Sequence, residues 1–279
     1  PGSAPGTSAE GSFPGIERGD GLVRPTDKKD LCLRVASYNI HRGIGRDGRY
    51  EPERILRVLE EMAADIVALQ EVDLPGTETA TILPWLAGKL NMAGVEGPVW
   101  LRDGREYGNA LLSRFPVEQV RHWDLSVGWH EPRGALDVDV RYRGRSIHVV
   151  STHLGLWPHE RPLQAKRLLE LLAVDRRELT VLMGDLNEWH MWGRVLRALY
   201  AVFGVPPAPP TFPARWPLLA LDRIWVAPPT ALLGVEAHRS EASRVASDHL
   251  PVKAELRLRA DRWTGASQEA RRSPVTATS

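Results

Sequence analysis

Short apolar runs that each end in a polar side chain are the feature that most constrains the fold of this 279-residue chain. The segment VLMGDLNEWH, residues 181–190, shows the pattern, because strand-forming residues stop there at a glycine, a carboxylate and an amide. A strand that merely ends needs only a turn, and Gly184 with Asp185 or Asn187 could supply one. Other apolar runs end similarly, which a single turn does not explain. The polar residues at these run ends are Asn39, Glu71, His153, Asp185 with Asn187, Asp222, and Asp248 with His249.

The apolar runs alternate with a few segments of helical periodicity, and this mixture predicts a sheet-rich α/β domain with helices outside. The segments 134–142 and 146–153 are joined by three residues and predict an antiparallel hairpin, so a purely parallel sheet is excluded. The segment 204–217 is too rich in proline for regular structure. Strands are predicted at 31–39, 66–71, 109–113, 134–142, 146–153, 180–185, 221–226, 234–239 and 251–258, and helices over 51–65, 80–91, 160–174 and 191–201.

Composition divides the chain into one folded domain and two flanking segments. Residues 1–29 are rich in Pro, Gly and Ser and predict a disordered N-terminal segment, and residues 260–279 predict a disordered tail. The folded domain therefore covers residues 30–259. No stretch approaches the roughly 18 apolar residues of a membrane span, and the N-terminus as given lacks the apolar core of a signal peptide. We expect a cytoplasmic monomer, with association to a membrane surface left open.

Charge and cysteine content exclude several classes of protein. The formal net charge is +1, from 36 basic and 35 acidic residues, so the chain has no global field to hold a polyanion, although a local basic patch is not excluded. Cys32 is the only cysteine, which excludes an intramolecular disulfide and a thiolate zinc cluster. Because it lies inside an apolar run, Cys32 is expected in the core.

The polar run ends define a chemistry if they share one edge of the sheets. Carboxylate and amide oxygens without thiolates suit a hard cation such as Mg²⁺ or Mn²⁺. Two histidines, each beside acids, suit proton transfer or charge stabilisation on a phosphoryl group. The residues by themselves therefore predict a hydrolytic site of the Mg²⁺ type on a sheet edge.

Seven motifs together resemble one known superfamily. In chain order they are ASYNIHRG, ALQEVD, YGNALLSR, STHLG, GDLNEW, LDRIWV and SDHLPV, between residues 31 and 258. This series resembles that of the endonuclease/exonuclease/phosphatase superfamily, which includes deoxyribonucleases, apurinic endonucleases, inositol polyphosphate 5-phosphatases and bacterial sphingomyelinases. The resemblance is strongest to the small bacterial branch. It implies a four-layer α/β/β/α sandwich of two mixed, mostly antiparallel sheets with outer helices, and an active site at one end of the packed sheets.

The resemblance also implies a metal site. Asn39 and Glu71 match the metal-binding pair of the superfamily, and both offer oxygen ligands. Asp248 matches a residue near the metal, which it would bind directly or through water. The implied cofactor is Mg²⁺ or Mn²⁺.

Catalytic roles are implied for five further positions. Asp185 matches the residue that positions or deprotonates the attacking water, and Asn187 matches an amide that donates to the phosphoryl oxygen. His249 matches the histidine at the phosphate, and Asp222 matches the carboxylate that orients its ring. His153 matches the second histidine of the deoxyribonuclease and sphingomyelinase branches.

Three further residues are candidates for substrate binding. Arg133 resembles a phosphate-contacting arginine, with a solvated arginine at a strand end as an equal alternative. Asn109 is expected to line the site, although an asparagine after a glycine is also a common turn residue. Trp189 belongs to a set of tryptophans near the expected mouth, of which about half are expected in the core. The set is Trp123, Trp129, Trp157, Trp189, Trp192 and Trp216.

The predicted activity is metal-dependent hydrolysis of a phosphoester by in-line attack of water, on a nucleic acid, a lipid or a small molecule. Exposed tryptophans would suit either stacking on bases of a single strand or insertion into a lipid interface. A phospholipid phosphodiesterase of sphingomyelinase type is therefore one alternative. A catalytically inactive binding module on the same fold is another, although Glu71, Asp185 and His249 are all retained.

Overall fold

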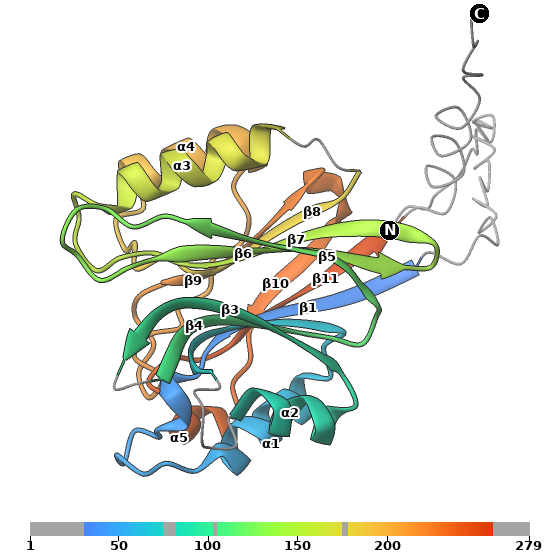
Figure 1. Ribbon diagram of the computed structural model, residues 1–279, viewed down its shortest axis with the longest axis vertical. Coiled ribbons are helices and arrows are strands. Elements are labelled where there is room, and N and C mark those ends of the chain that lie inside the picture. The colour runs from blue at the N-terminus through green and yellow to red at the C-terminus, as the bar shows by residue number, and fades with distance from the viewer. Residues whose placement is uncertain (1–30, 75–81, 103–104, 175–177, 259–279) are drawn as a thin grey trace, which may run out of the picture.

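The computed structural model describes residues 31–74, 82–102, 105–174 and 178–258, and the segments 1–29 and 260–279 lie outside these described residues. Within them, two β-sheets pack face to face and helices cover their outer faces (Figure 1). The predicted four-layer α/β/β/α sandwich is confirmed. In the described part of the chain, every helix is too short or too polar to cross a membrane.

The first sheet has six strands in the order β10-β11-β1-β2-β4-β3, and its β1 and β2 are parallel while its other pairs are antiparallel. Its strands are β1 (Leu31–Asn39), β2 (Ile66–Asp73), β3 (Ala93–Arg102), β4 (Arg105–Ser113), β10 (Leu232–Ala237) and β11 (Val252–Leu258). The second sheet has five strands in the order β5-β6-β7-β8-β9, with β7 and β8 parallel. Its strands are β5 (Val117–Asp124), β6 (Gly134–Tyr142), β7 (Arg145–His153), β8 (Thr180–Asp185) and β9 (Asp222–Ala227).

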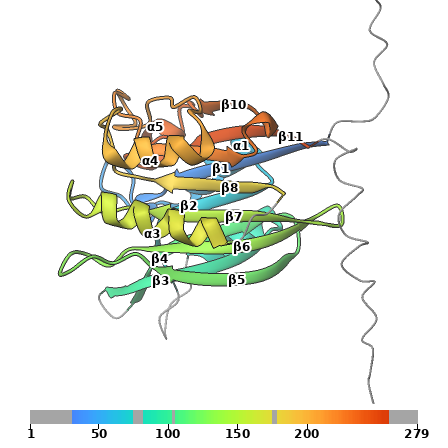
Figure 2. The ribbon, with the colours of Figure 1, turned by 90° about the horizontal axis from the view of Figure 1, so that it is seen from above.

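The helices lie outside the two sheets. In Figure 2, α3 and α4 lie side by side across the five-stranded sheet, and the other helices cover the six-stranded sheet (Figure 1). The α-helices are α1 (Pro52–Met62), α2 (Ile82–Leu90), α3 (Arg161–Val174), α4 (Arg194–Phe203) and α5 (Ser243–Ala246), and two 3-10 turns are η1 (His41–Gly43) and η2 (Pro229–Ala231).

Helix α1 shows how local sequence gives the outer layer. Pro52 occupies the first turn, where its missing N–H has no partner to lose. Ile55, Val58 and Met62 are buried on one face of the helix, as their helical spacing predicts. The helix ends at Ala63, which adopts the left-handed conformation.

Three apolar layers hold the sandwich together. Between the sheets, side chains such as Leu33 and Val35 of β1 meet Val149 of β7 and Val181 of β8. One outer layer packs α1 and α2 on the six-stranded sheet, and the other packs α3 and α4 on the five-stranded sheet. With all three layers closed, the polar strand ends are left at one edge of the sandwich.

The structure adds two strands that the sequence pattern did not predict. Strand β3 contains Gly94, Gly97 and Pro98, which interrupt the alternation of apolar and polar residues that predicts a strand. Strand β5 is an edge strand that is mostly exposed or half-buried, so it lacks a continuous apolar run. The expectation that Cys32 lies in the core is wrong, because its side chain is exposed. Leu33 faces the core, and alternation along the strand turns Cys32 to the outer face.

Candidate active site

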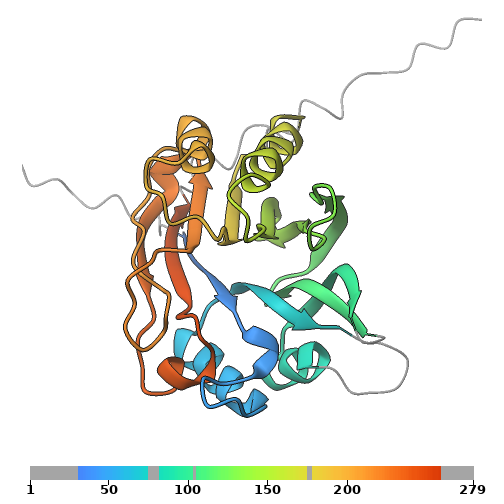
Figure 3. The same cartoon turned by 90° about the vertical axis from the view of Figure 1, so that its left-hand side faces the viewer.

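Three adjacent strands of the second sheet bring three of the candidate residues into one row. His153 ends β7, Asp185 ends the parallel strand β8, and Asp222 begins the antiparallel strand β9. The strand register pairs His153 with Asp185 and Asp185 with Asp222. All three side chains are buried. The predicted convergence of these run ends therefore follows directly from strand order, and Figure 3 looks onto this edge of the sandwich.

The first sheet contributes Asn39 and Glu71 to the same edge. Glu71 does not end its strand as the sequence pattern predicts, because it lies within β2 at a bulge, with φ of 57°. Such a bulge re-aims a side chain. The Asn39 Nδ2 atom donates to Glu71 Oε1 at 3.0 Å and to Asp185 Oδ2 at 3.1 Å. The Asn39 amide thus joins the two sheets at the site.

Asp185 uses its two carboxylate oxygens for different purposes. Oδ1 accepts the backbone N–H of Asn187 at 2.9 Å. This hydrogen bond closes the turn that a strand end at this position requires. Oδ2 lies 3.5 Å from His153 Nε2 and 3.7 Å from His249 Nε2. Gly184 allows this geometry, because a Cβ atom there would lie 1.8 Å from the Thr152 carbonyl oxygen. The turn and a reactive carboxylate therefore coexist in one residue.

His249 is held as an imidazolium by carboxylates. Its Nδ1 atom lies 2.8 Å from Asp222 Oδ2. Burial opposes the charged ring, but Asp222 and then Asp185 outweigh it and raise the pKa of His249 to about 10. The second oxygen of Asp222 is buried and has no hydrogen-bond partner among the described residues. At neutral pH this pair places a positive charge beside Asp185.

His153 is in the opposite state. Burial, with Arg133 and His249 nearby, lowers the pKa of His153 to about 3, although Asp185 opposes the shift. Its Nε2 atom lies 3.1 Å from the Asn187 Nδ2 atom, so a neutral ring accepts that amide hydrogen. Two histidines with separated pKa values on either side of one carboxylate are an arrangement suited to acid–base chemistry.

Asp248 lies at the mouth of the site rather than inside it. Its side chain is 40% exposed, and its Oδ1 atom lies 4.0 Å from His41 Nδ1. Ser247 links it to the first sheet, because the Ser247 hydroxyl donates to the Asn39 backbone carbonyl at 2.7 Å and lies 3.3 Å from Asp248 Oδ1. Asp248 is therefore connected to Asn39 through one hydroxyl group.

Arg133 and Asn109 lie beside His153 around a small cavity of about 10 Å³, room for about one water molecule. Arg133 is buried and pairs with Glu131 at 3.0 Å, so the alternative of a solvated strand-end arginine is wrong. The Asn109 Nδ2 atom donates to the Gly134 carbonyl at 3.1 Å. Arg133 Nε and Asn109 Oδ1 are buried without a partner in the described part of the chain. Unsatisfied buried groups of this kind are places where a ligand or water binds.

Trp189 is 43% exposed, and its ring lies 4.9 Å from the Arg161 guanidinium carbon. The sequence pattern did not single out Arg161, which is fully buried. Its Nη1 atom donates to the Leu156 carbonyl at 2.6 Å, and its Nε atom lies 3.5 Å from Glu188 Oε2. Arg161 therefore joins the loop after β7 to the loop after β8. The available signal was a charged residue at a helix start, which is too common to be informative.

Tyr107 is a second residue that sequence reasoning missed. It lies in β4, is buried, and hydrogen-bonds with Glu71. Burial, followed by the charges of Glu71 and Glu131, raises the pKa of the Tyr107 hydroxyl. The hydroxyl therefore stays protonated and can hold the Glu71 carboxylate in place.

Two sets of side chains offer ligands for a divalent cation. Asp185, Asp222 and His249 have ligand atoms within 4.8 Å of one another. However, the His249 ring is cationic and its Nδ1 atom is engaged by Asp222, so this set is better suited to proton transfer than to metal binding. Glu71, Asn39 and Asp248 offer oxygens alone, which fits Mg²⁺ or Mn²⁺.

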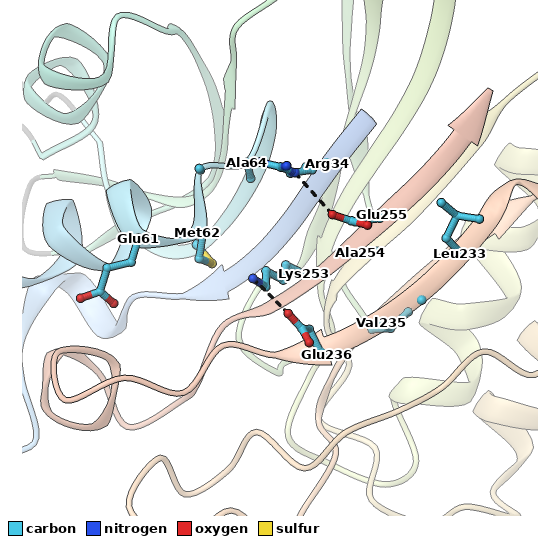
Figure 4. A pocket seen from close by; sticks show the side chains of 12 residues that line it. Arg34, Glu61, Met62, Ala64, Leu233, Val235, Glu236, Lys253, Ala254 and Glu255 are labelled. Atoms are coloured by element: carbon cyan, nitrogen blue, oxygen red, sulfur yellow. Dashed lines mark ion pairs between the residues drawn. The ribbon is translucent and has the colours of Figure 1, made fainter. Parts of the chain in front are cut away.

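A hollow of about 550 Å³ lies away from this edge, between α1 and the outer faces of β1, β10 and β11 (Figure 4). Its charged groups are paired, Arg34 with Glu255 at 3.5 Å and Lys253 with Glu236 at 3.0 Å. Because their charges are balanced internally, they leave little reason for an ionic ligand to bind.

The fold is that of a family whose members are hydrolases that act on phosphoester bonds. The sequence model described as Endonuclease/Exonuclease/phosphatase family matches residues 36–249, so the chain belongs to this family. Its members generally use divalent metals.

The chain is similar to individual proteins over most of its length. The uncharacterized protein YbhP of Escherichia coli strain K12 is 30% identical over 258 residues, which cover 84% of this chain and 100% of YbhP. An endonuclease/exonuclease/phosphatase from Beutenbergia cavernae has a TM-score of 0.67 at 26% identity, over 81% of this chain and 72% of that chain. A mannosyl-6-phosphatase from Bacteroides thetaiotaomicron has a TM-score of 0.62 at 21% identity, over 80% and 99%, and this likeness shows the fold alone.

Proposed function

We propose that this chain is a Mg²⁺- or Mn²⁺-dependent hydrolase of phosphoester bonds, in which Asp185 activates water. The observation that carries the proposal is the buried carboxylate of Asp185 with one oxygen aimed at both His153 and His249. A carboxylate so placed can accept a proton from water, and an imidazolium beside it can stabilise a phosphoryl group.

The metal site of the proposal is the oxygen set of Glu71, Asn39 and Asp248. Bound there, Mg²⁺ or Mn²⁺ neutralises negative charge on the phosphoryl oxygens. Glu71 supplies the anionic ligand, held by Asn39 and by the Tyr107 hydroxyl. The side-chain oxygen of Asn39, Oδ1, accepts the backbone N–H of His41 at 3.1 Å and keeps a lone pair for a cation.

The remaining residues orient the substrate and control protons. The Nε2–H of His249 donates to a phosphoryl oxygen, and Asp222 holds the ring in that orientation. Asn187 Nδ2 donates one hydrogen to the Leu154 carbonyl at 2.9 Å and the other to His153 Nε2, so this amide donates to a phosphoryl oxygen by exchanging its bond to His153. The neutral His153 ring leaves its neighbour Asp185 free to accept a proton. Arg133 donates to a phosphate oxygen through its Nε–H, and Asn109 Oδ1 accepts a hydrogen bond from a water or a substrate hydroxyl, because both groups lack partners in the described structure.

A substrate panel tests this function. The purified full chain is assayed with bis-p-nitrophenyl phosphate, p-nitrophenyl phosphate, single- and double-stranded DNA, and phospholipid vesicles, each with Mg²⁺, Mn²⁺ or EDTA. The sugar phosphatase of the same fold is the reason to include monoesters. We expect hydrolysis of at least one phosphoester that requires the metal. Turnover that is unchanged after EDTA treatment, with metal loss verified, would rule out the metal site.

A further inference from the structure

The loops around the site expose an unusual number of large apolar side chains. We call six of them the tryptophan rim: Trp129, Leu156, Trp157, Trp192, Trp216 and Leu218. Their exposed fractions run from 57% for Trp157 to 103% for Trp129. They belong to the loops β5–β6, β7–α3, β8–α4 and α4–β9, which Figure 3 shows at the edge facing the viewer.

The expectation that about half of the tryptophans near the mouth lie in the core is wrong. Of that set, Trp123 alone is not exposed, and its Nε1 atom donates to Asp137 at 2.9 Å. An exposed indole costs free energy in water, because its large apolar surface stays hydrated. Exposed apolar side chains that gather around one edge mark a surface that contacts a partner.

Beside the tryptophan rim lies a hollow of about 560 Å³, which we call the arginine hollow. Four arginines from separate parts of the chain line it, together with Trp216. They are Arg46, Arg215, Arg239 and Arg244. All four side chains are exposed, and the wall of the hollow contains no acidic residue.

The charges of the arginine hollow are not balanced within the described structure. Arg46 Nη1 donates to the Arg244 backbone carbonyl at 3.4 Å, and Arg215 lies 6.0 Å from the centre of the Trp216 ring. None of the four forms an ion pair with another described residue, in contrast to the paired charges of the hollow in Figure 4. Like charges around one hollow repel one another, and an anion relieves that repulsion.

The arginine hollow is joined directly to the active site. Ala214 in its wall donates its backbone N–H to the Asp248 carbonyl at 2.7 Å. Leu250, also in the wall, follows His249 and donates to the Thr211 carbonyl at 2.8 Å. A surface bound at the hollow is therefore held next to the histidine that faces the phosphoester.

We propose that this edge of the molecule docks on a phospholipid surface rich in anionic lipid. The tryptophan rim enters the interface between headgroups and acyl chains, and the arginine hollow binds a headgroup phosphate. Tryptophan favours this interface because its ring is apolar and its N–H is polar. Arginine binds phosphate through two parallel hydrogen bonds. This inference rests on the proposed function and names an anionic phospholipid as the class of substrate presented to the site.

The composition of the edge favours a lipid surface over a single-stranded nucleic acid. Leu156 and Leu218 are 60% and 79% exposed, and aliphatic side chains give a base no ring to stack on. A single strand also needs a row of cations along its backbone, whereas the four arginines gather in one hollow.

The test is co-sedimentation of the full chain with vesicles, in EDTA so that turnover does not contribute. Vesicles of phosphatidylcholine are compared with vesicles of phosphatidylcholine mixed with phosphatidylglycerol. We expect stronger binding to the anionic vesicles, with a blue shift of tryptophan fluorescence. Because vesicle binding is measured without catalysis, the docking proposal and the proposed function can fail separately. Vesicle binding can be absent in a protein that hydrolyses soluble substrates, and it can be present in a protein that does not.

Variants separate the contribution of the arginine hollow to vesicle binding from that of the tryptophan rim. Arg239→Ala with Arg244→Ala is expected to weaken partition into anionic vesicles by about 25-fold, about fivefold for each charge. Trp129→Ala with Trp192→Ala is expected to weaken it by about tenfold or more, with hydrolysis of soluble bis-p-nitrophenyl phosphate unchanged. The control for the arginine variant is Arg143→Ala, in the β6–β7 hairpin at the opposite edge.

An apolar control completes the set. Leu233 is 44% exposed and lies beside the hollow of Figure 4, so Leu233→Ala should leave vesicle binding unchanged. Equal binding to both kinds of vesicle, or equal losses in edge and control variants, would overturn the proposal. The proposal would also be overturned if the protein did not sediment with vesicles but bound a single-stranded oligonucleotide, and if Trp129→Ala with Trp192→Ala weakened that binding.

Discussion

Replacing Asp222 with asparagine removes the charge that holds His249 as an imidazolium while keeping the shape of the side chain. Asp222 is fully buried and its Oδ2 atom lies 2.8 Å from His249 Nδ1. An opposite charge at this distance raises the pKa of a histidine by about 1 to 3. We therefore expect Asp222→Asn to lower the pKa of His249 from about 10 to about 8.

The same change has a consequence for stability. The unfolded ring titrates near its ordinary pKa of 6.5 and the folded ring at about 10, so the folded state binds more protons between these values. This contribution to stability is complete below pH 6.5 and is lost as the pH rises through 10. In Asp222→Asn this decline should end at a lower pH and be smaller.

NMR titration of the His249 ring in EDTA-treated protein measures the pKa, and urea unfolding at several pH values measures the stability. Turnover of the metal-loaded variant should fall by about 10²-fold, because the charge facing the phosphoryl group is less well held. A wild-type His249 that titrates near 6.5, or a variant with unchanged pKa and kcat, would refute this reasoning.

Four further predictions test other parts of the site and fold. Asp185→Asn should lower kcat by about 10²- to 10³-fold with little change in KM, and an unchanged kcat at wild-type Tm would remove Asp185 from the chemistry. Glu71→Gln should weaken Mg²⁺ binding in calorimetry while the metal-free Tm stays similar or rises, and an unfolded variant would make Glu71 structural. Burial opposes the charge of Asp137, but hydrogen bonds from His148, Arg121 and Trp123 hold the pKa of that carboxyl below its ordinary range. The stability that this carboxylate contributes should therefore be full above about pH 4 and fall at lower pH. Asp137→Asn should flatten that acid decline in urea unfolding. Gly184→Ala should destabilise the fold by about 2 kcal/mol or more in urea unfolding, because its methyl group would meet the Thr152 carbonyl, and a wild-type Tm would show that the two strands separate easily.

The row of polar strand ends could be predicted because it depends on strand order alone. Asp185 and His153 end parallel neighbours, and Asp222 begins the antiparallel strand beside them. Each strand and its polar end can thus be recognised locally in the sequence, and pairing of the strands in the sheet brings these ends together. Glu71 was less predictable in position, because the β-bulge that aims it depends on pairing with β4, which the local pattern does not encode.

Buried charges were the part of the site that the sequence pattern could not show. Arg161 and Glu188 are buried, with the Arg161 guanidinium over the Trp189 ring, yet in the sequence they are ordinary polar residues at the start of a helix and after a strand. Their burial follows from the packing of two loops against each other. The exposure of Trp129 and Trp192 was equally unpredictable, because tryptophan is mostly buried in folded proteins.

The most direct test of the central claim is the rate of bis-p-nitrophenyl phosphate hydrolysis as Mn²⁺ is titrated into metal-free protein, for the wild type and Asp185→Asn side by side. The account predicts a saturable rise in rate for the wild type, and a variant that folds normally but turns over about 10²-fold or more slowly at saturating metal. Equal rates in the two proteins, or a wild-type rate independent of the metal, would contradict it.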